Sequence, residues 1–322
     1  MRVVVIDAGY ESYDYERAAL ARLGATFEMF EGGRHDRAGK AAFARGAAGI
    51  FVRWTEVDGD FLDAVAGVRA IVRYGVGYDN VDLAAASARH VRVSNVQGYA
   101  NHSVSDHALA LLLACVRGLR IGTAQVRTHY LAPPRPHLPE LKDMTLGIVG
   151  LGRIGGTLCA KGRHLFKRVL ACDPYIPAER FTSLGAEACD LARLLAESDA
   201  ISVHCNLTEE TRLMFGQDAF ARMRPSAIFV NTARGPIVDE DALLDALNAE
   251  RIYAAGLDVF WDEPPLANRD ALLAHPHVAA TGHYAWFSTA ASVELQRRAA
   301  DNMVMMLRGE LPEDCLNPEP FR

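Results

Sequence analysis

The sequence has no excess of positive charge. Its 322 residues include 34 Lys and Arg against 40 Asp and Glu, which gives a formal net charge of −6. Binding to the phosphates of a nucleic acid, or to an anionic membrane, needs a basic excess. A local basic patch is compatible with these numbers, but we expect neither a nucleic acid nor a membrane as a partner of this chain.

Long apolar runs are also missing. The longest extends from Ala108 to Val116, which is far short of the ~20 apolar residues that span a bilayer. The first residues, MRVVVIDAGYESYDYE, become acidic after one short apolar segment and show no pattern of a secretory signal. The expected location is therefore the cytoplasm.

Cysteine is scarce, with 6 residues in the whole chain and no C-x-x-C pair. Most of the cysteines lie inside apolar runs, so we expect buried free thiols, as suits a reducing compartment. His275 and His277 are close in sequence, but no cysteine or acidic residue stands at ligand spacing from them. We expect no metal site.

Hydrophobic residues make up 50% of the chain, which is enough for more than one core, and the length suggests two domains. Short apolar segments alternate with segments of helical periodicity, a pattern typical of parallel sheets covered by helices. The expected strands are 3–7, 26–30, 49–53, 70–74, 91–95, 145–149, 168–172, 200–204, 227–231, 253–259 and 278–282.

Two long helices and one break are expected between and after these strands. The segment 103–118 is apolar on nearly all sides, which indicates burial between two bodies, and 288–309 has the pattern of an amphipathic helix. The segment 128–143 is rich in proline and cannot continue a helix. The alternation of strands and helices restarts after it.

The most specific motif is the segment GLGRIG, which begins at Gly150. It follows an expected strand and opens an expected helix, as in a dinucleotide-binding loop. Gly150 allows the tight turn, Gly152 lets the backbone approach a pyrophosphate, and Gly155 allows the helix to pack closely on the strand. The amides and the positive dipole end of the helix start favour phosphates, and Arg153 can add a direct contact.

Asp173 follows the next expected strand, 168–172. A carboxylate at this place accepts hydrogen bonds from the ribose hydroxyls of the adenosine and repels a 2′-phosphate. The cofactor is therefore predicted to be NAD rather than NADP. Because the glycine-rich loop begins far from the N-terminus, a complete α/β body precedes the nucleotide-binding domain.

Three more polar segments follow expected strands: NTARG from Asn231, GLDVFWDEP from Gly256 and TGHYAW from Thr281. In open α/β sheets, ligands bind beyond the carboxyl ends of the strands. Together with the glycine-rich loop, these segments closely resemble the D-2-hydroxyacid dehydrogenase family, whose pattern contains GxGxIG, NxxRG, GxDVFxxEP and a late histidine. Further motifs of the family have similar segments in this chain at 73–82, 95–99 and 104–107. The resemblance therefore covers nearly the whole chain.

The resemblance implies an NAD-dependent oxidoreductase that transfers hydride between the nicotinamide and a D-2-hydroxy acid or 2-keto acid. The implied fold class is α/β, with two doubly wound parallel-sheet domains. A Rossmann NAD-binding domain at 101–285 is inserted into a flavodoxin-like substrate-binding domain made of 1–100 and 286–322. A homodimer is expected from the family and from the apolar segment 103–118.

The catalytic set implied by the resemblance is Arg234, Glu263 and His283. The guanidinium of Arg234 can hold the substrate carboxylate and polarise the ketone. The imidazole of His283 can donate the proton that the forming alkoxide needs. Glu263 would hydrogen-bond the other ring nitrogen and favour the protonated imidazole for reduction.

The same resemblance implies contacts with substrate and cofactor. Backbone amides around Val76 and Gly77 would bind the substrate carboxylate, and Tyr99 would line the pocket. Asp258 would lie beside the carboxamide of the nicotinamide. The full set of expected cofactor contacts is Gly150, Gly152, Arg153, Ile154, Gly155, Asp173, Cys205, Asn206, Thr211, Thr232, Ala233, Arg234, Asp258 and His283.

Some positions depart from the family pattern or stay open. Gly282 stands where a proline usually precedes the histidine, and it is expected to loosen that loop. Trp261 replaces an acidic residue and either narrows the site or lies outside it. Arg53 and Arg73 either bind a second anion of the substrate or form structural ion pairs.

The segment 283–288, HYAWFS, also resembles the C-terminal-binding-protein corepressors, which share this fold and use NADH to drive assembly. An NADH-sensing binding protein is therefore the alternative function. Because the chain retains Arg234, Glu263 and His283, the sequence favours an enzyme over this binding protein.

Overall fold

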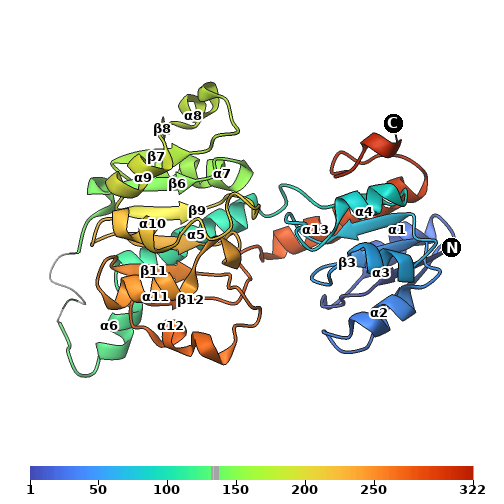
Figure 1. Ribbon diagram of the computed structural model, residues 1–322, viewed down its shortest axis with the longest axis horizontal. Coiled ribbons are helices and arrows are strands. Elements are labelled where there is room, and N and C mark those ends of the chain that lie inside the picture. The colour runs from blue at the N-terminus through green and yellow to red at the C-terminus, as the bar shows by residue number, and fades with distance from the viewer. Residues whose placement is uncertain (132, 134–137, 322) are drawn as a thin grey trace. The chain divides into compact units, whose positions relative to one another are not determined.

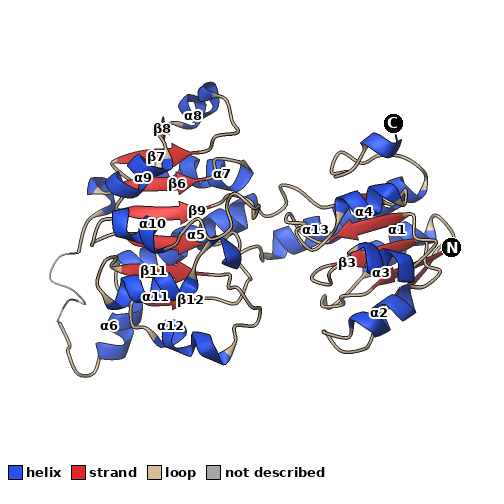
Figure 2. Cartoon of the chain, viewed as in Figure 1, coloured by secondary structure: helices blue, strands red, loops and turns tan. Residues whose placement is uncertain are grey.

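The computed structural model describes residues 1–131, 133 and 138–321. They divide into two compact units, Met1–Tyr99 with Ser288–Arg322, and Ala100–Phe287. We call these the terminal unit and the central unit. The proline-rich segment 128–143 lies partly outside the described residues. Each unit is a parallel sheet with helices on its faces (Figure 1, Figure 2).

The terminal unit contains a five-stranded sheet with the order β2-β1-β3-β4-β5, and every neighbouring pair is parallel. This is the flavodoxin-like order, as predicted. Its strands are β1 (Arg2–Val5), β2 (Thr26–Met29), β3 (Gly49–Val52), β4 (Ala70–Arg73) and β5 (Arg92–Ser94). Its α-helices are α1 (Asp14–Ala21), α2 (Arg37–Ala44), α3 (Gly59–Ala64), α4 (Leu83–Ala88) and α13 (Thr289–Leu307), and a 3₁₀ turn, η4, covers Glu319–Phe321.

Aspartates start three helices of the terminal unit. The side chains of Asp36, Asp58 and Asp82 accept hydrogen bonds from backbone amides in the first turns of α2, α3 and α4. Each satisfies an amide that has no partner within its own helix. The long C-terminal helix α13 packs on α1 and β4, so the two ends of the chain share one core.

The central unit contains a seven-stranded sheet with the order β12-β11-β10-β9-β6-β7-β8, again parallel throughout. Counted from β6, this is the Rossmann order 3-2-1-4-5-6 with one more strand, as predicted. Its strands are β6 (Thr145–Val149), β7 (Arg168–Cys172), β8 (Glu187–Ala188), β9 (Ala200–Val203), β10 (Ile228–Asn231), β11 (Ala254–Leu257) and β12 (Val278–Ala280).

Helices cover both faces of this sheet. Those before β10 are α5 (Asn101–Val116), α6 (Leu119–Gln125), η1 (Leu141–Asp143), α7 (Arg153–Gly162), α8 (Ala178–Leu184), α9 (Leu191–Glu197) and α10 (Gln217–Arg222). Those after it are η2 (Gly235–Ile237), α11 (Glu240–Asn248), η3 (Ala267–Arg269) and α12 (Asp270–Ala274).

Each face of the central sheet has its own core. On one face, Phe229 of β10 packs against the rings of Phe215 and Phe220, with centroids 4.9 and 5.5 Å away. On the other face, the apolar helix α5 packs on β10, β11, β12 and α7. The sequence predicted that this helix would be buried between two bodies, and the structure buries it against the sheet and α7 of the central unit itself.

No single described helix is long and apolar enough to cross a membrane. The helices α5 and α6 reach that length and composition only when taken together, and the chain bends by 51° between them.

All six cysteines are free, but only Cys115 and Cys159 are fully buried. The expectation of buried thiols is wrong for the other four, which are partly exposed. Three of these, Cys172, Cys189 and Cys205, lie at or just beyond strand ends and pack only partly against the core of the central unit.

Candidate active site

The glycine-rich loop connects β6 to α7 and takes the shape that a dinucleotide needs. Gly150 has a φ of +89°, and a Cβ there would lie 2.6 Å from the backbone nitrogen of Cys205. A Cβ on Gly155 would lie 2.0 Å from the carbonyl oxygen of Gly150. Both positions therefore require glycine for packing. Gly152 differs, because no described atom lies within 4 Å of its Cβ position.

This loop lies where the strand order of the central sheet reverses, between β6 and β9. Ligands of open α/β sheets bind at such a point. The loop after β9 brings Cys205 against Gly150 and is folded by Thr211, whose hydroxyl donates to the Asn206 carbonyl oxygen at 2.6 Å. Cys205, Asn206 and Thr211 thus belong to a loop that flanks the expected phosphate site.

Asp173 stands at the end of β7 and faces the glycine-rich loop. One carboxylate oxygen accepts a hydrogen bond from the Leu151 amide at 2.8 Å, and the other accepts from the Tyr175 amide at 3.0 Å. A carboxylate has about four acceptor positions, so these two bonds leave capacity for ribose hydroxyls. The side chain fixes the loop and can also take part in binding.

The central unit has features that fit a bound dinucleotide. The Thr232 hydroxyl, after β10, is buried and has no hydrogen-bond partner among the described residues. A buried polar atom without a partner is costly unless a ligand or water supplies one. The N-terminus of α7 has no side-chain cap, and the space beside its N-cap residue, Gly152, is open.

The segment after β10 holds Arg234. Nδ2 of the Asn231 side chain donates to the Arg234 carbonyl oxygen at 2.9 Å, and Oδ1 of the same side chain accepts from the Ala233 backbone amide at 3.0 Å. A Cβ on Gly235 would lie 2.0 Å from the carbonyl of Phe260. The loops after β10 and β11 therefore touch, backbone to backbone, directly beside the arginine.

His283 and Glu263 form a close pair. The Nδ1 atom of His283 lies 2.5 Å from Oε2 of Glu263, and the two side chains remain 38% and 32% exposed. His283 has a φ of +55°, an unusual conformation for a residue with a side chain. Because Nδ1 faces the carboxylate, Nε2 is the ring nitrogen left for a reacting group.

Asp258 is fully buried and ties the loop that carries His283. Its carboxylate accepts from the Thr281 hydroxyl at 2.6 Å and from the amides of Tyr284 and Ala285 at 3.1 and 2.9 Å. Its backbone oxygen accepts from the His283 amide at 2.7 Å. The sequence predicted that Asp258 lies beside the cofactor. The structure shows that its carboxylate accepts hydrogen bonds from the loop that carries His283.

This loop is tied to the chain on both sides of Gly282, through Thr281 and His283. The proposed looseness at Gly282 is therefore confined to one residue. Trp261 is also held in place, because its indole nitrogen donates to the Val238 carbonyl oxygen at 2.7 Å and its amide to Glu240 at 2.8 Å. The indole lies against the segment that leads into α11.

The other predicted substrate residues belong to the terminal unit. Gly75, which precedes Val76 and Gly77, has a φ of +126°. The Val76 carbonyl oxygen accepts from the side chain of Asn95 at 2.5 Å, which braces the loop after β4. Tyr99 also lies near this loop, since a Cβ on Gly75 would be 3.6 Å from its hydroxyl.

Arg53 follows β3, and Arg73 is the last residue of β4 in the same unit. The Arg53 guanidinium lies over the rings of Tyr10 and Trp54, at 4.8 and 4.9 Å from their centroids. The Arg73 guanidinium donates to the Tyr74 carbonyl oxygen at 2.8 Å.

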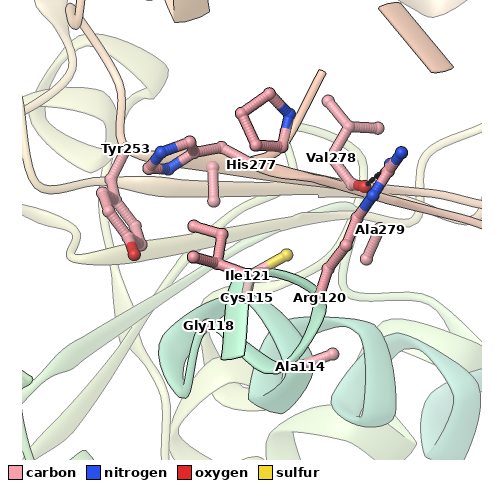
Figure 3. A pocket seen from close by; sticks show the side chains of 11 residues that line it. Ala114, Cys115, Gly118, Arg120, Ile121, Tyr253, His277, Val278 and Ala279 are labelled. Carbon is pink, nitrogen blue, oxygen red and sulfur yellow. Dashed lines mark hydrogen bonds between the residues drawn. The ribbon is translucent and has the colours of Figure 1, made fainter. Parts of the chain in front are cut away.

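A small pocket of the central unit lies at the amino ends of β11 and β12, whereas the candidate site lies beyond the carboxyl ends of the strands (Figure 3). Its lining includes Cys115 of α5 and Tyr253 and His277, which precede β11 and β12. Arg120 crosses it to donate to the Val278 carbonyl oxygen. Burial raises the pKa of the Cys115 thiol to about 12, so this cysteine is not a reactive thiolate. The pocket contains none of the predicted site residues.

The chain is similar in sequence and in fold to known proteins. Residues 109–285 match the NAD binding domain described for D-isomer specific 2-hydroxyacid dehydrogenases. The chain is 38% identical, over 94% of its length, to D-3-phosphoglycerate dehydrogenase of Mycobacterium leprae, of which it covers 57%. It spans about half the length of several further phosphoglycerate dehydrogenases.

A relative of similar length is the glyoxylate reductase of Korarchaeum cryptofilum, 36% identical over 82% of this chain and 80% of that protein. Among solved structures, a glyoxylate reductase from Paecilomyes thermophila is 25% identical and covers 99% of both chains with a TM-score of 0.86.

Proposed function

Because the chain belongs to the D-isomer specific 2-hydroxyacid dehydrogenase family, with an NAD-binding Rossmann domain, we propose that it is an NAD-dependent oxidoreductase of D-2-hydroxy acids and 2-keto acids. The observation that carries the proposal is the pair of His283 and Glu263 at 2.5 Å. It lies beyond the carboxyl ends of the strands in the same unit as the glycine-rich loop. No observation favours the corepressor alternative.

Arg234, His283 and Glu263 divide the work on the substrate. The guanidinium of Arg234 binds the carboxylate and the carbonyl oxygen of a 2-keto acid, and so favours negative charge on that oxygen. His283 donates the proton of Nε2 to the same oxygen during reduction and takes it back during oxidation. Glu263, at Nδ1, orients the ring so that Nε2 faces the substrate. Bound NADH would supply the hydride.

The residues that would hold NAD are those predicted around three loops of the central unit. Gly152, Arg153 and Ile154 would face the pyrophosphate at the start of α7. The Thr232 hydroxyl is buried without a partner among the described residues. It would form a hydrogen bond with the nicotinamide half of the cofactor, and Ala233 would contact the same half. Asp173 would bind the adenosine ribose and select NAD over NADP.

We assign NAD binding and the reacting groups Arg234, Glu263 and His283 to the central unit, and the remaining substrate contacts to the terminal unit. The amides of Val76 and Gly77 would bind the substrate carboxylate, and Tyr99 would contact its side chain. The protein is proposed to be cytoplasmic and to work as a homodimer.

The substrate has two candidate classes. The relatives include phosphoglycerate dehydrogenases and glyoxylate reductases, whose named substrates differ in whether they carry a phosphate. Arg53 and Arg73, at neighbouring strand ends of the terminal unit, supply the cationic groups that a second anion needs. Their presence favours a 2-keto acid that carries a second anionic group.

The test is NADH oxidation with pyruvate, glyoxylate, hydroxypyruvate, longer 2-keto acids and 3-phosphohydroxypyruvate. We expect turnover on at least one, with a preference for the phosphorylated acid that falls in the Arg53→Gln and Arg73→Gln variants. No turnover on any of these acids, with NADH demonstrably bound, would rule out the proposed function. Unchanged selectivity in both arginine variants would leave the activity but remove the second-anion role.

A further inference from the structure

We propose that His107 and Thr281 are positioning residues that hold the loop bearing His283 through the buried carboxylate of Asp258. The inference rests on the proposed function, because it assigns a role to residues that support its proton donor. All of the groups involved belong to the central unit, and His107 comes from α5, on an element far from the catalytic loops in sequence.

The hydrogen bonds define a directed chain. The Thr281 hydroxyl oxygen lies 2.6 Å from Oδ1 of Asp258 and 3.5 Å from the Leu257 carbonyl oxygen. Its single proton therefore goes to the carboxylate. The Nε2 atom of His107 lies 2.8 Å from the same hydroxyl oxygen, so this nitrogen must be the donor. The chain runs from His107 to Thr281 to Asp258.

The end of this chain is the group that fixes the catalytic loop. The Asp258 side chain is 1% exposed, so its carboxylate oxygens need hydrogen-bond donors from the protein. Those donors are the Thr281 hydroxyl before His283 and the amides of Tyr284 and Ala285 after it. The His107 ring also lies 3.6 Å from Oδ1 of Asp258.

His107 adds packing to these polar contacts. Its ring meets the ring of Tyr284 edge to face, with centroids 5.1 Å apart. It therefore contacts the loop on both sides of His283, once by hydrogen bond and once by packing. His283 holds a left-handed backbone conformation between these contacts, and such a conformation persists only where the surroundings enforce it.

Two pairs of variants separate the hydrogen bonds from packing. Thr281→Val keeps the shape and removes the hydroxyl, whereas Thr281→Ser keeps the hydroxyl. His107→Phe keeps a ring against Tyr284 and removes the donor, whereas His107→Gln keeps a donor. Thr145→Val is the matched control, because Thr145 is a buried threonine of β6 whose hydroxyl accepts from Arg168 instead.

Three readouts are needed: kcat and KM for the preferred 2-keto acid, NADH affinity by fluorescence titration, and hydrogen exchange of the peptide 281–287 without cofactor. We expect Thr281→Val and His107→Phe to lower kcat by about 10- to 100-fold, since small displacements of a catalytic group have effects of this size. The NADH dissociation constant should stay within about twofold. Exchange of the peptide should become faster in both variants.

The double variant His107→Phe/Thr281→Val should be no slower than the slower single variant, because both remove one chain of bonds. Thr281→Ser, His107→Gln and Thr145→Val should stay close to the wild type. Additive effects of the two substitutions, or an unchanged exchange rate in Thr281→Val, would overturn the proposal. The exchange measurement decides this even if the wild type reduces no 2-keto acid, an outcome that would instead defeat the proposed function.

Discussion

Nδ1 of His283 lies 2.5 Å from Oε2 of Glu263, and the two residues come from loops that follow neighbouring strands, β12 and β11. The carboxylate reaches the imidazole at Nδ1, the ring nitrogen opposite Nε2. Under the proposed function, Glu263 would set the ring orientation while Nε2 would carry the transferred proton.

Replacing His283 with alanine should lower kcat by about 10²- to 10⁴-fold, as expected when a general acid is lost. NADH affinity should be nearly intact, because the phosphate and ribose contacts lie on other loops. Steady-state kinetics and fluorescence titration measure the two effects. His102→Ala, at an exposed histidine of the same unit, is the control. A large loss of NADH affinity in His283→Ala would show that the histidine serves binding instead.

Arg234→Lys keeps the charge but loses the planar pair of donors that a carboxylate prefers. We expect kcat/KM for the 2-keto acid to fall about 10- to 100-fold, the loss that corresponds to one or two bonds between charged groups. NADH affinity should change much less. Arg251→Lys, at an exposed position of the central unit, should have no effect. Full activity in Arg234→Lys would mean that only its charge matters.

Two alanine substitutions in the glycine-rich loop should affect different properties, one the stability of the protein and the other its affinity for NADH. A Cβ on Gly155 would meet the Gly150 carbonyl oxygen at 2.0 Å, whereas a Cβ on Gly152 meets no described atom within 4 Å. Gly155→Ala should therefore lower the melting temperature. Gly152→Ala should leave the melting temperature unchanged and weaken NADH binding, because its methyl group would occupy the phosphate site. Tight NADH binding by Gly152→Ala would contradict this placement of the pyrophosphate.

Much of the fold was predictable because its strands are buried on both faces. β6 and β10 are mostly apolar in sequence and buried at every residue, as expected for central strands of a parallel sheet. The edge strand β8 escaped prediction, since it comprises Glu187 and Ala188 and both are exposed. Two exposed residues at the edge of a sheet show no apolar pattern in the sequence. Only the backbone hydrogen bonds to β7 define this strand.

Candidate site residues could be named from the sequence where they lie shortly after strands, as Arg234 and His283 do. The contact between His107 and Thr281 could not be predicted, because these residues are 174 positions apart. No local spacing relates them, and only the packing of α5 on the sheet brings them together. Residues that support a catalytic group in this way are identified by the structure and not by a motif.

Asp173→Ala should weaken the preference for NADH over NADPH, since the alanine no longer repels a 2′-phosphate or binds the ribose. The kcat/KM values for the two cofactors give the preference ratio. Part of the change will reflect the lost bond to the Leu151 amide at 2.8 Å, so Asp173→Asn is the matched variant. It retains an acceptor for that amide without the charge. An unchanged ratio in both variants would remove Asp173 from the ribose site.

His204 should make the central unit sensitive to acid. Burial lowers the pKa of this histidine to about 4, and its Nε2 lies 2.8 Å from the Ser202 hydroxyl. In the unfolded chain a histidine takes up its proton near pH 6.5. Between these two values the unfolded state binds more protons than the folded state, so stability falls as the pH falls from about 6.5 toward about 4.

The loss of unfolding free energy from this residue should approach ~1.4 kcal/mol per pH unit within that window. Urea unfolding at about pH 7 and about pH 5 measures it. His204→Gln cannot be protonated, so the difference between the two conditions should shrink, whereas the exposed His102→Gln should retain it. Equal pH dependence in His204→Gln and the wild type would show that His204 is not held neutral in the folded protein.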